Sequence, residues 1–166
     1  HIASGIRMAL ARKDPEYLDE LAAHHVGGHL KVAPEHVSER VLARMKKPGI
    51  EAFEEFAERF EAASRRAGKE QFLVPYFIAS HPGSRVEDMI ELAIFLKQRG
   101  YRPRQVQDFI PAPMDIATCI YFTGLDPMTM RPVDTVKRLK DRETQRALMQ
   151  FFAPRNWFVV RKALLD

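Results

Sequence analysis

Polar side chains directly follow a buried, strand-like run near the middle of the chain. The run at residues 72–79 is apolar, aromatic and β-branched, and it continues into Ser80 and His81 before a Pro-Gly break at residues 82–83. The next four residues, Ser-Arg-Val-Glu (84–87), fit a capping box and predict the start of a helix. Parallel α/β folds bind ligands at the carboxyl ends of their strands. The segment therefore predicts either a binding site or a plain strand-to-helix connection without function.

Three further strand-like segments end in polar residues or in a proline-rich break. They are residues 4–7 (Ser-Gly-Ile-Arg), residues 30–36 (Leu-Lys-Val-Ala-Pro-Glu-His) and residues 106–114 (Val-Gln-Asp-Phe-Ile-Pro-Ala-Pro-Met). The alternation over residues 105–110 is typical of a strand. His36 and His81 lack the spacing of a zinc ligand set, so we expect no metal site from them.

The composition indicates a globular protein with one ordinary domain. The 166 residues are 46% hydrophobic and 29% charged, with a net charge of +4, and no apolar run is long enough to span a bilayer. The one cysteine, Cys119, cannot form an internal disulfide, which favours a reducing, cytoplasmic location. The chain does not begin with Met, and we expect it to begin inside a longer protein.

The elements that would position these residues alternate between strand and helix. Repeated strand–helix units build a parallel sheet, here about four strands, which is either a small open sheet or part of a larger TIM-like barrel. We expect one domain over residues 1–166, divided into strand–helix units (1–113) and a long loop with carboxyl-terminal helices (114–166). The expected helices cover residues 15–26, 38–47, 50–68, 85–99, 135–152 and 156–165.

The combination of the blocks Val-Ala-Pro-Glu-His (32–36) and Phe-Ile-Ala-Ser-His-Pro-Gly (77–83) resembles a known family. Together with the other two strand ends, they are similar to the carboxyl-terminal half of the radical S-adenosylmethionine domain of YgiQ-type proteins. The resemblance covers residues 4–165, and a more distant similarity links the same blocks to methylthiotransferases that modify RNA and ribosomal protein. It implies a partial parallel barrel whose remaining strands belong to the rest of the parent protein.

The resemblance implies a chemistry that this chain could perform only in part. The family cleaves S-adenosylmethionine at a 4Fe–4S cluster to give a 5′-deoxyadenosyl radical, and three cysteines in a C-x-x-x-C-x-x-C loop hold that cluster. This loop is absent here, so we expect the chain alone to be inactive and the parent to be the enzyme. Carried over by position, Ser4 and Arg7 would face the carboxylate or ribose of S-adenosylmethionine, and Glu35 would face its ribose or amino group. The adenine would lie against Ile78, Ala79, Ser80 and His81. An unknown substrate would face Asp108, Pro111 and Met114.

Simpler interpretations remain for several of these residues. Arg7 could pair with a surface carboxylate. Glu35 could have no role beyond a favourable interaction of its negative charge with the positive amino end of the following helix. The basic residues at 137–146 could form a solvated face or contact RNA. The rival function is therefore a non-catalytic binding module that meets RNA or protein through this helix. An open sheet edge would also favour a homodimer of the isolated chain.

Overall fold

The computed structural model of this protein describes residues 2 and 5–166, and its three named strands form one sheet in the order β1-β2-β3. The strands are β1 (His29–Glu35), β2 (Phe72–Ala79) and β3 (Gln107–Asp108). β2 and β3 run parallel, and Ile6 forms a separate parallel bridge with Val32 of β1. The predicted α/β class with a partial parallel sheet is confirmed. β2 has the predicted bounds, whereas β3 is shorter than predicted, and among the described residues of the expected amino-terminal strand Ile6 forms this bridge.

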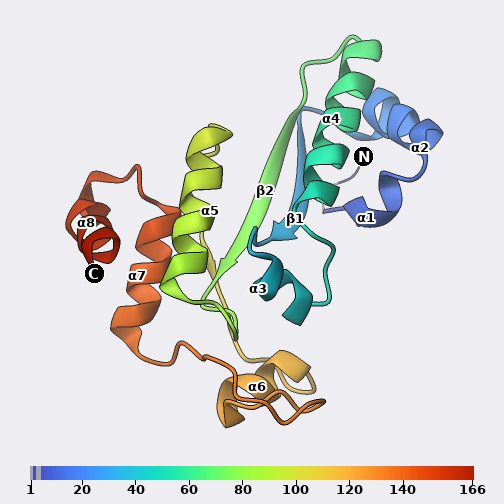
Figure 1. Cartoon of the computed structure of the whole chain (residues 1–166). Helices are drawn as coiled ribbons and strands as arrows, with labels where there is room; N and C mark the ends of the chain where they lie inside the picture. Colours follow the sequence, from blue (N-terminus) through green and yellow to red (C-terminus); the bar gives the residue numbers. More distant parts are fainter. Residues whose placement is uncertain (1, 3–4) are drawn as a thin grey trace. The chain divides into compact units, whose positions relative to one another are not determined.

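Helices occupy most of the remaining chain (Figure 1). They are α1 (Met8–Ala11), α2 (Pro15–Glu20), the π-helical η1 (Leu21–His25), α3 (Glu39–Arg44), α4 (Glu51–Arg66), α5 (Val86–Gln98), α6 (Ile116–Thr123), α7 (Leu139–Met149), the 3₁₀ turn η2 (Pro154–Asn156) and α8 (Trp157–Leu165).

The elements group into two compact units. The first comprises His1–Glu35 and Pro48–Tyr76, and the second comprises His36–Lys47 and Phe77–Asp166. In the first unit, α1 and α2 pack against α4. A stripe of phenylalanines on α4 forms its core, because Phe53, Phe56 and Phe60 are almost completely buried and recur at helical spacing.

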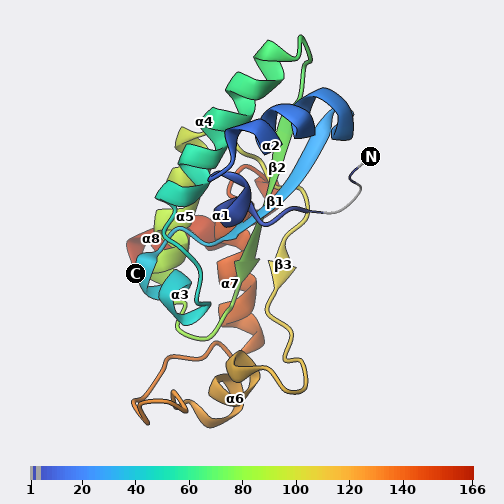
Figure 2. The same ribbon diagram turned by 90° about the vertical axis from the view of Figure 1, so that its right-hand side faces the viewer.

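The second unit places α7 between α5 and α8 (Figure 1). Met89, Leu92 and Leu96 of α5 are fully buried, as are Leu148 and Met149 of α7. Figure 2 shows β3 continuing through an extended segment to α6. The carboxyl end of β2 and all of β3 belong to this unit, so it contains the strand ends at residues 78–81 and 107–108.

The long loop predicted at the start of residues 114–166 is wrong in part, because it contains α6. Asp115 caps this helix, with its side chain accepting a hydrogen bond of 2.9 Å from the backbone N–H of Ala117. Gly124 ends it in the left-handed conformation, with φ of 71°. The glycine is therefore a helix terminator within the segment and gives no evidence against a helix there.

Two predicted helix starts are also wrong in position. The cap of α5 uses the Asp88 carboxylate, which accepts a 2.7 Å hydrogen bond from the backbone N–H of Arg85, in place of the predicted Ser84–Glu87 box. The helix predicted from residue 135 begins at Leu139. The chain before it is tied to the turn after β2, since the carbonyl of Asp134 accepts a 2.7 Å hydrogen bond from the backbone N–H of Gly83.

Candidate functional site

Two buried oxygen atoms that have no partner among the described residues lie at the ends of adjacent parallel strands. Ala79, the last residue of β2, is paired with Asp108, the last residue of β3, and Ser80 follows directly. Within the described part of the chain, neither Ser80 Oγ nor Asp108 Oδ1 has a hydrogen-bond partner, although both are buried. Leaving such a group unpaired costs about 1–3 kcal/mol, so a ligand or ordered water is the usual explanation.

The Asp108 carboxylate is fixed by its other oxygen. Arg146 donates to Oδ2 at 3.0 Å, and the Arg142 guanidinium lies 3.3 Å from the same oxygen. Arg142 also donates to the carbonyl of Phe109 at 2.8 Å. Two arginines of α7 thus hold one side of the carboxylate and leave Oδ1 available to a hydrogen-bond donor. Because both arginines contact Asp108, fewer basic side chains of residues 137–146 remain for the predicted contact with RNA.

Gln145 of α7 holds the turn after β2 in place. Its Oε1 accepts hydrogen bonds from the backbone N–H of Ser80 at 2.8 Å and from the Ser84 hydroxyl at 3.1 Å. Its Nε2 donates to the carbonyl of Ser84 at 3.2 Å. All three residues are buried, so these bonds are shielded from water. The position of Ser80 is therefore set by a side chain that lies 65 residues later in the chain.

Three further predicted residues, Ile78, Ala79 and His81, are neighbours of Ser80 in the chain. Ile78 is half-buried and Ala79 is fully buried, and the Ala79 carbonyl accepts a 2.8 Å hydrogen bond from the backbone N–H of Phe109. His81 is buried, and its ring packs edge-on against the Phe109 ring at 5.2 Å between centroids. Its Nδ1 lies 2.9 Å from the carbonyl of Pro82. The pair Ser80-His81 thus combines a polar oxygen with an aromatic surface.

A second polar cluster ties α3 to the start of α5. Asp88 accepts hydrogen bonds from the Ser38 hydroxyl at 2.6 Å and from the backbone N–H of Arg85 at 2.7 Å, and it also pairs with Arg40. Burial alone would raise the pKa of Asp88, but these hydrogen bonds and the Arg40 charge lower it below its usual value. The carboxylate therefore stays ionised.

His36 is a neutral structural histidine. Its Nδ1 accepts a 3.0 Å hydrogen bond from the backbone N–H of Ser38, which places the ring proton on Nε2, 3.4 Å from the Met89 sulfur. Desolvation by burial lowers the pKa of His36 to about 4, against the opposing attraction of Asp88. Both ring nitrogens are engaged, so the geometry gives a metal ion no free ligand atom here.

The remaining predicted residues lie elsewhere. Arg7 is exposed before α1, and Glu35 is half-buried at the end of β1; both belong to the first unit. Pro111 is half-buried, and Met114 is fully exposed in the turn before α6. Ser4 lies outside the described residues. The roles assigned to all of these residues stay predictions.

Backbone strain is concentrated at the predicted strand ends. Five described residues other than glycine have positive φ, and three of them are predicted site residues: Glu35 (71°), Ser80 (62°) and Met114 (66°). The left-handed region costs a side-chain-bearing residue about 1–2 kcal/mol, and such strain clusters at functional sites. The strain at Ser80 coincides with its unpaired hydroxyl.

The two implied cofactor groups fit this chain differently. An iron–sulfur cluster needs several cysteine thiolates, whereas the one cysteine, Cys119, is exposed on α6. The described residues also contain no group of three or more His, Cys, Asp or Glu side chains arranged to hold a metal. The cluster therefore does not fit. S-adenosylmethionine, which carries hydroxyl and ammonium donors, does fit the unpaired oxygens of Ser80 and Asp108.

Sequence reasoning missed the α7 residues that complete the site. The basic residues Arg142 and Arg146 were expected on a polar surface, and Gln145 was not singled out. One signal was present for Gln145, which lies one helical turn before the apolar pair Leu148 and Met149 and therefore on their face.

Comparisons with known proteins match most of this chain. Residues 104–166 match a family described as "Domain of unknown function (DUF3362)". The chain is 46% identical over 168 residues to UPF0313 protein YgiQ of Escherichia coli K12, covering 98% of this chain and 23% of that protein. It is 47% identical over 169 residues to a UPF0313 protein of Rhodopseudomonas palustris, covering 98% and 25%, and 48% identical over 160 residues to one of Methanosarcina acetivorans, covering 96% and 22%.

The fold is that of an α/β protein, and the matched relatives are UPF0313 proteins. The chain belongs to the UPF0313 (YgiQ) family, and it spans about a quarter of the length of the curated relatives it matches. The predicted family is thereby confirmed. The radical chemistry, the cofactor and the substrate of the longer proteins stay predictions.

The cellular location and the partners of the chain are predictions from its composition and from the family resemblance. In the part of the chain that the structure describes, no helix combines the length and apolar character needed to cross a membrane. The cytoplasmic location, the rest of the parent barrel as a partner, the RNA contact and the homodimer stay predictions.

Proposed function

We propose that this segment contributes an S-adenosylmethionine-binding surface to a longer UPF0313-family protein, a radical S-adenosylmethionine enzyme. The observation that carries the proposal is the pair of buried oxygens that have no partner in the described chain, Ser80 Oγ and Asp108 Oδ1, at the ends of neighbouring parallel strands. Ligands of parallel α/β proteins bind at this edge of the sheet.

The chemistry of the two oxygens suits this ligand. The Asp108 carboxylate, which the family resemblance assigns to an unknown substrate, can also accept from a ribose hydroxyl or from the ammonium group of S-adenosylmethionine. The Ser80 hydroxyl can donate or accept. Arg142 and Arg146 orient Asp108 through its other oxygen. The ring of His81 and the side chain of Ile78 supply the apolar surface that a purine base requires.

The proposal for this chain stops at cofactor binding. The cluster that cleaves S-adenosylmethionine needs ligands that these residues do not supply, so they would come from another part of the longer protein. A non-catalytic RNA-binding module receives less support, because Arg142 and Arg146 of the basic helix are engaged by Asp108.

The test is equilibrium dialysis of radiolabelled S-adenosylmethionine against the full-length protein that carries this segment. Losing one buried hydrogen bond to the ligand predicts about tenfold weaker binding for Ser80→Ala, and losing one to a charged group predicts more for Asp108→Asn. The matched control is Ser64→Ala on α4, a buried serine whose hydroxyl is already bonded to the Phe60 carbonyl. Unchanged affinity in both site variants would refute the proposal.

A further inference from the structure

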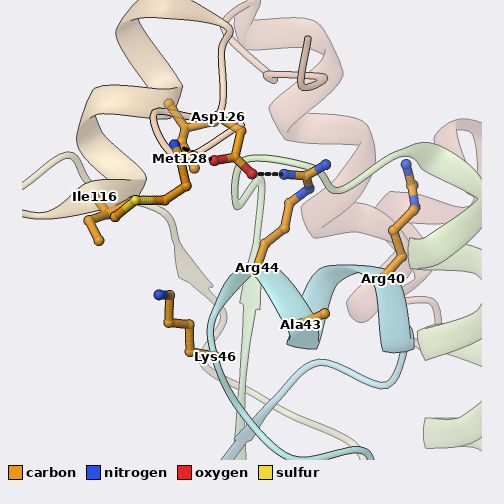
Figure 3. A pocket seen from close by; sticks show the side chains of 8 residues that line it. Arg40, Ala43, Arg44, Lys46, Ile116, Asp126 and Met128 are labelled. Carbon is orange, nitrogen blue, oxygen red and sulfur yellow. Dashed lines mark hydrogen bonds and ion pairs between the residues drawn. The ribbon is translucent and has the colours of Figure 1, made fainter. Parts of the chain in front are cut away.

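A separate pocket of about 450 Å³ lies within the second unit (Figure 3). Its volume is within the range of small-molecule sites and exceeds what a lone inorganic anion would fill. One side is cationic and the other is apolar, and neither Ser80 nor Asp108 takes part. The lining consists of Arg40, Ala43, Arg44, Lys46, Ile116, Ile120, Asp126 and Met128.

The cationic side comes from α3 and the residues after it. Arg40 pairs with Asp88 and with Asp134, and Arg44 makes a longer pair of 3.4 Å with Asp126. In contrast, the Lys46 ammonium makes no ion pair or hydrogen bond with any described residue of the chain. Figure 3 shows Lys46 on the side of Arg44 where Ile116 lies. Lys46 thus gives the pocket a cation that no described carboxylate neutralises.

The backbone around these side chains is held in unusual conformations. Lys46 has a positive φ of 52°, a strained value for a side-chain-bearing residue. Gly83 has a φ of 90°, and a Cβ there would lie 2.6 Å from the Arg44 Cδ. The Pro-Gly turn after β2 is therefore shaped to let the Arg44 stem pass beside it.

The apolar side belongs to α6 and the loop after it. Ile120 is buried, whereas Met128 is 70% exposed and Ile116 is 42% exposed. Asp126 lies between the two sides. The pKa of the Asp126 carboxyl group is lowered, mainly by a hydrogen bond from the backbone N–H of Met128. Asp126 therefore remains the anionic partner of Arg44, and a ligand anion would be drawn to the Lys46 side.

We propose that this pocket binds a small organic phosphate ester, with the phosphate at Lys46 and Arg44 and the organic body against Ile116, Ile120 and Met128. A guanidinium offers five N–H donors, so Arg44 can contact a phosphate while keeping its pair with Asp126. The apolar wall distinguishes an ester from the free anion. This inference is independent of S-adenosylmethionine binding, because the two sites share no residue.

Titration of the 166-residue chain with phenyl phosphate, followed through the methyl NMR signals of Met128 and Ile116, tests this proposal. We expect saturable shifts of both methyls, with inorganic phosphate and phenol each binding about tenfold more weakly or worse. Lys46→Gln should weaken phenyl phosphate binding by about tenfold, while Lys97→Gln, which removes an exposed lysine of α5, should leave it unchanged.

Three results would overturn the proposal. They are the absence of saturable methyl shifts, equal weakening by Lys46→Gln and Lys97→Gln, and inorganic phosphate binding as tightly as the ester. A Met128→Ala variant adds a check that does not remove a charge: it should weaken phenyl phosphate and leave any binding of inorganic phosphate unchanged. If Met128→Ala affects both probes equally, the apolar wall has no role in binding.

Discussion

The backbone N–H of Ser80 donates a 2.8 Å hydrogen bond to Oε1 of Gln145, and this bond joins the end of β2 to the middle of α7. The same side-chain amide of Gln145 also serves Ser84 through two further bonds. One side chain therefore satisfies three polar groups of the turn that follows the strand. Ser80, which donates the bond to Oε1, has a strained backbone, with a φ of 62°.

Replacing Gln145 by Leu should lower the free energy of unfolding by about 3 kcal/mol or more, because it leaves several buried polar groups without partners. Urea unfolding of the chain measures this loss. Gln98→Leu, at an exposed position of α5, is the matched control and should change stability by less than about 0.5 kcal/mol. Equal stability of the two variants would contradict the role assigned to Gln145.

Gly83→Ala should destabilise the second unit by two separate effects. The φ of 90° disfavours any side chain, and the new Cβ would meet Arg44. Gly100→Ala is the matched control for backbone strain alone, since Gly100 has a φ of 71° and no described atom within 4 Å of the position that a Cβ would take. We expect Gly83→Ala to cost clearly more than Gly100→Ala, for which strain alone predicts about 1 kcal/mol.

A double-mutant cycle separates these two effects at Gly83. Arg44→Ala removes the side chain that the new Cβ meets, so Gly83→Ala should cost less in that background. The unfolding free energies of the four proteins give the coupling directly. Additive losses would show that Arg44 does not determine the requirement for glycine.

His36 should make stability depend on pH between about 6.5 and 4. Its pKa is about 4 in the folded chain and 6.5 when unfolded, so in this window the unfolded state binds more protons. Stability is therefore fully present above pH 6.5 and falls as the pH is lowered, by up to about 3 kcal/mol. Unfolding free energies at several pH values measure the slope.

His36→Gln should flatten this pH profile, whereas His24→Gln, at an exposed position of η1, should preserve it. NMR titration of the His36 ring provides an independent measurement of its pKa. A ring that becomes protonated near pH 6.5 in the folded chain would contradict the buried, neutral assignment.

The first unit should depend on the phenylalanine core of α4. Phe56 is fully buried beside Phe60, with the ring centroids 6.1 Å apart. Phe56→Ala should therefore cost about 3–5 kcal/mol of unfolding free energy. Phe72→Ala, at the exposed start of β2, provides the comparison and should cost far less. Similar losses from both changes would contradict the position of the core.

Periodicity and local capping were sufficient to predict much of the fold. The phenylalanine spacing predicts α4, and the apolar run at residues 72–79 predicts β2. Asp14-Pro15 indicates the start of α2, where the Asp14 side chain accepts a 3.0 Å hydrogen bond from the backbone N–H of Tyr17. These signals are encoded within a few residues. The α6 helix was missed because Gly124 and Pro127 favour a loop, whereas the opposing signal, the Asp115 cap, is a single residue.

The sequence predicts the site residues on the strands but not those on α7. The position of Ser80 directly after an apolar strand marks it as a candidate, since strand ends are local features, whereas Asp108 is a candidate through the family resemblance. Their partners on α7 could not be predicted, because whether Arg142 and Arg146 face solvent or Asp108 depends on how α7 packs. Long-range packing likewise decides that the Ser84 hydroxyl bonds Gln145 and does not cap α5.

The most direct test of the proposed function is a crystal structure of the full-length protein with S-adenosylmethionine bound. We expect polar atoms of the ligand to lie within hydrogen-bond distance of Ser80 Oγ and Asp108 Oδ1, the two oxygens at the strand ends that have no partner within the described chain. A ligand bound elsewhere, with both oxygens bonded only to protein or water, would contradict the proposed function.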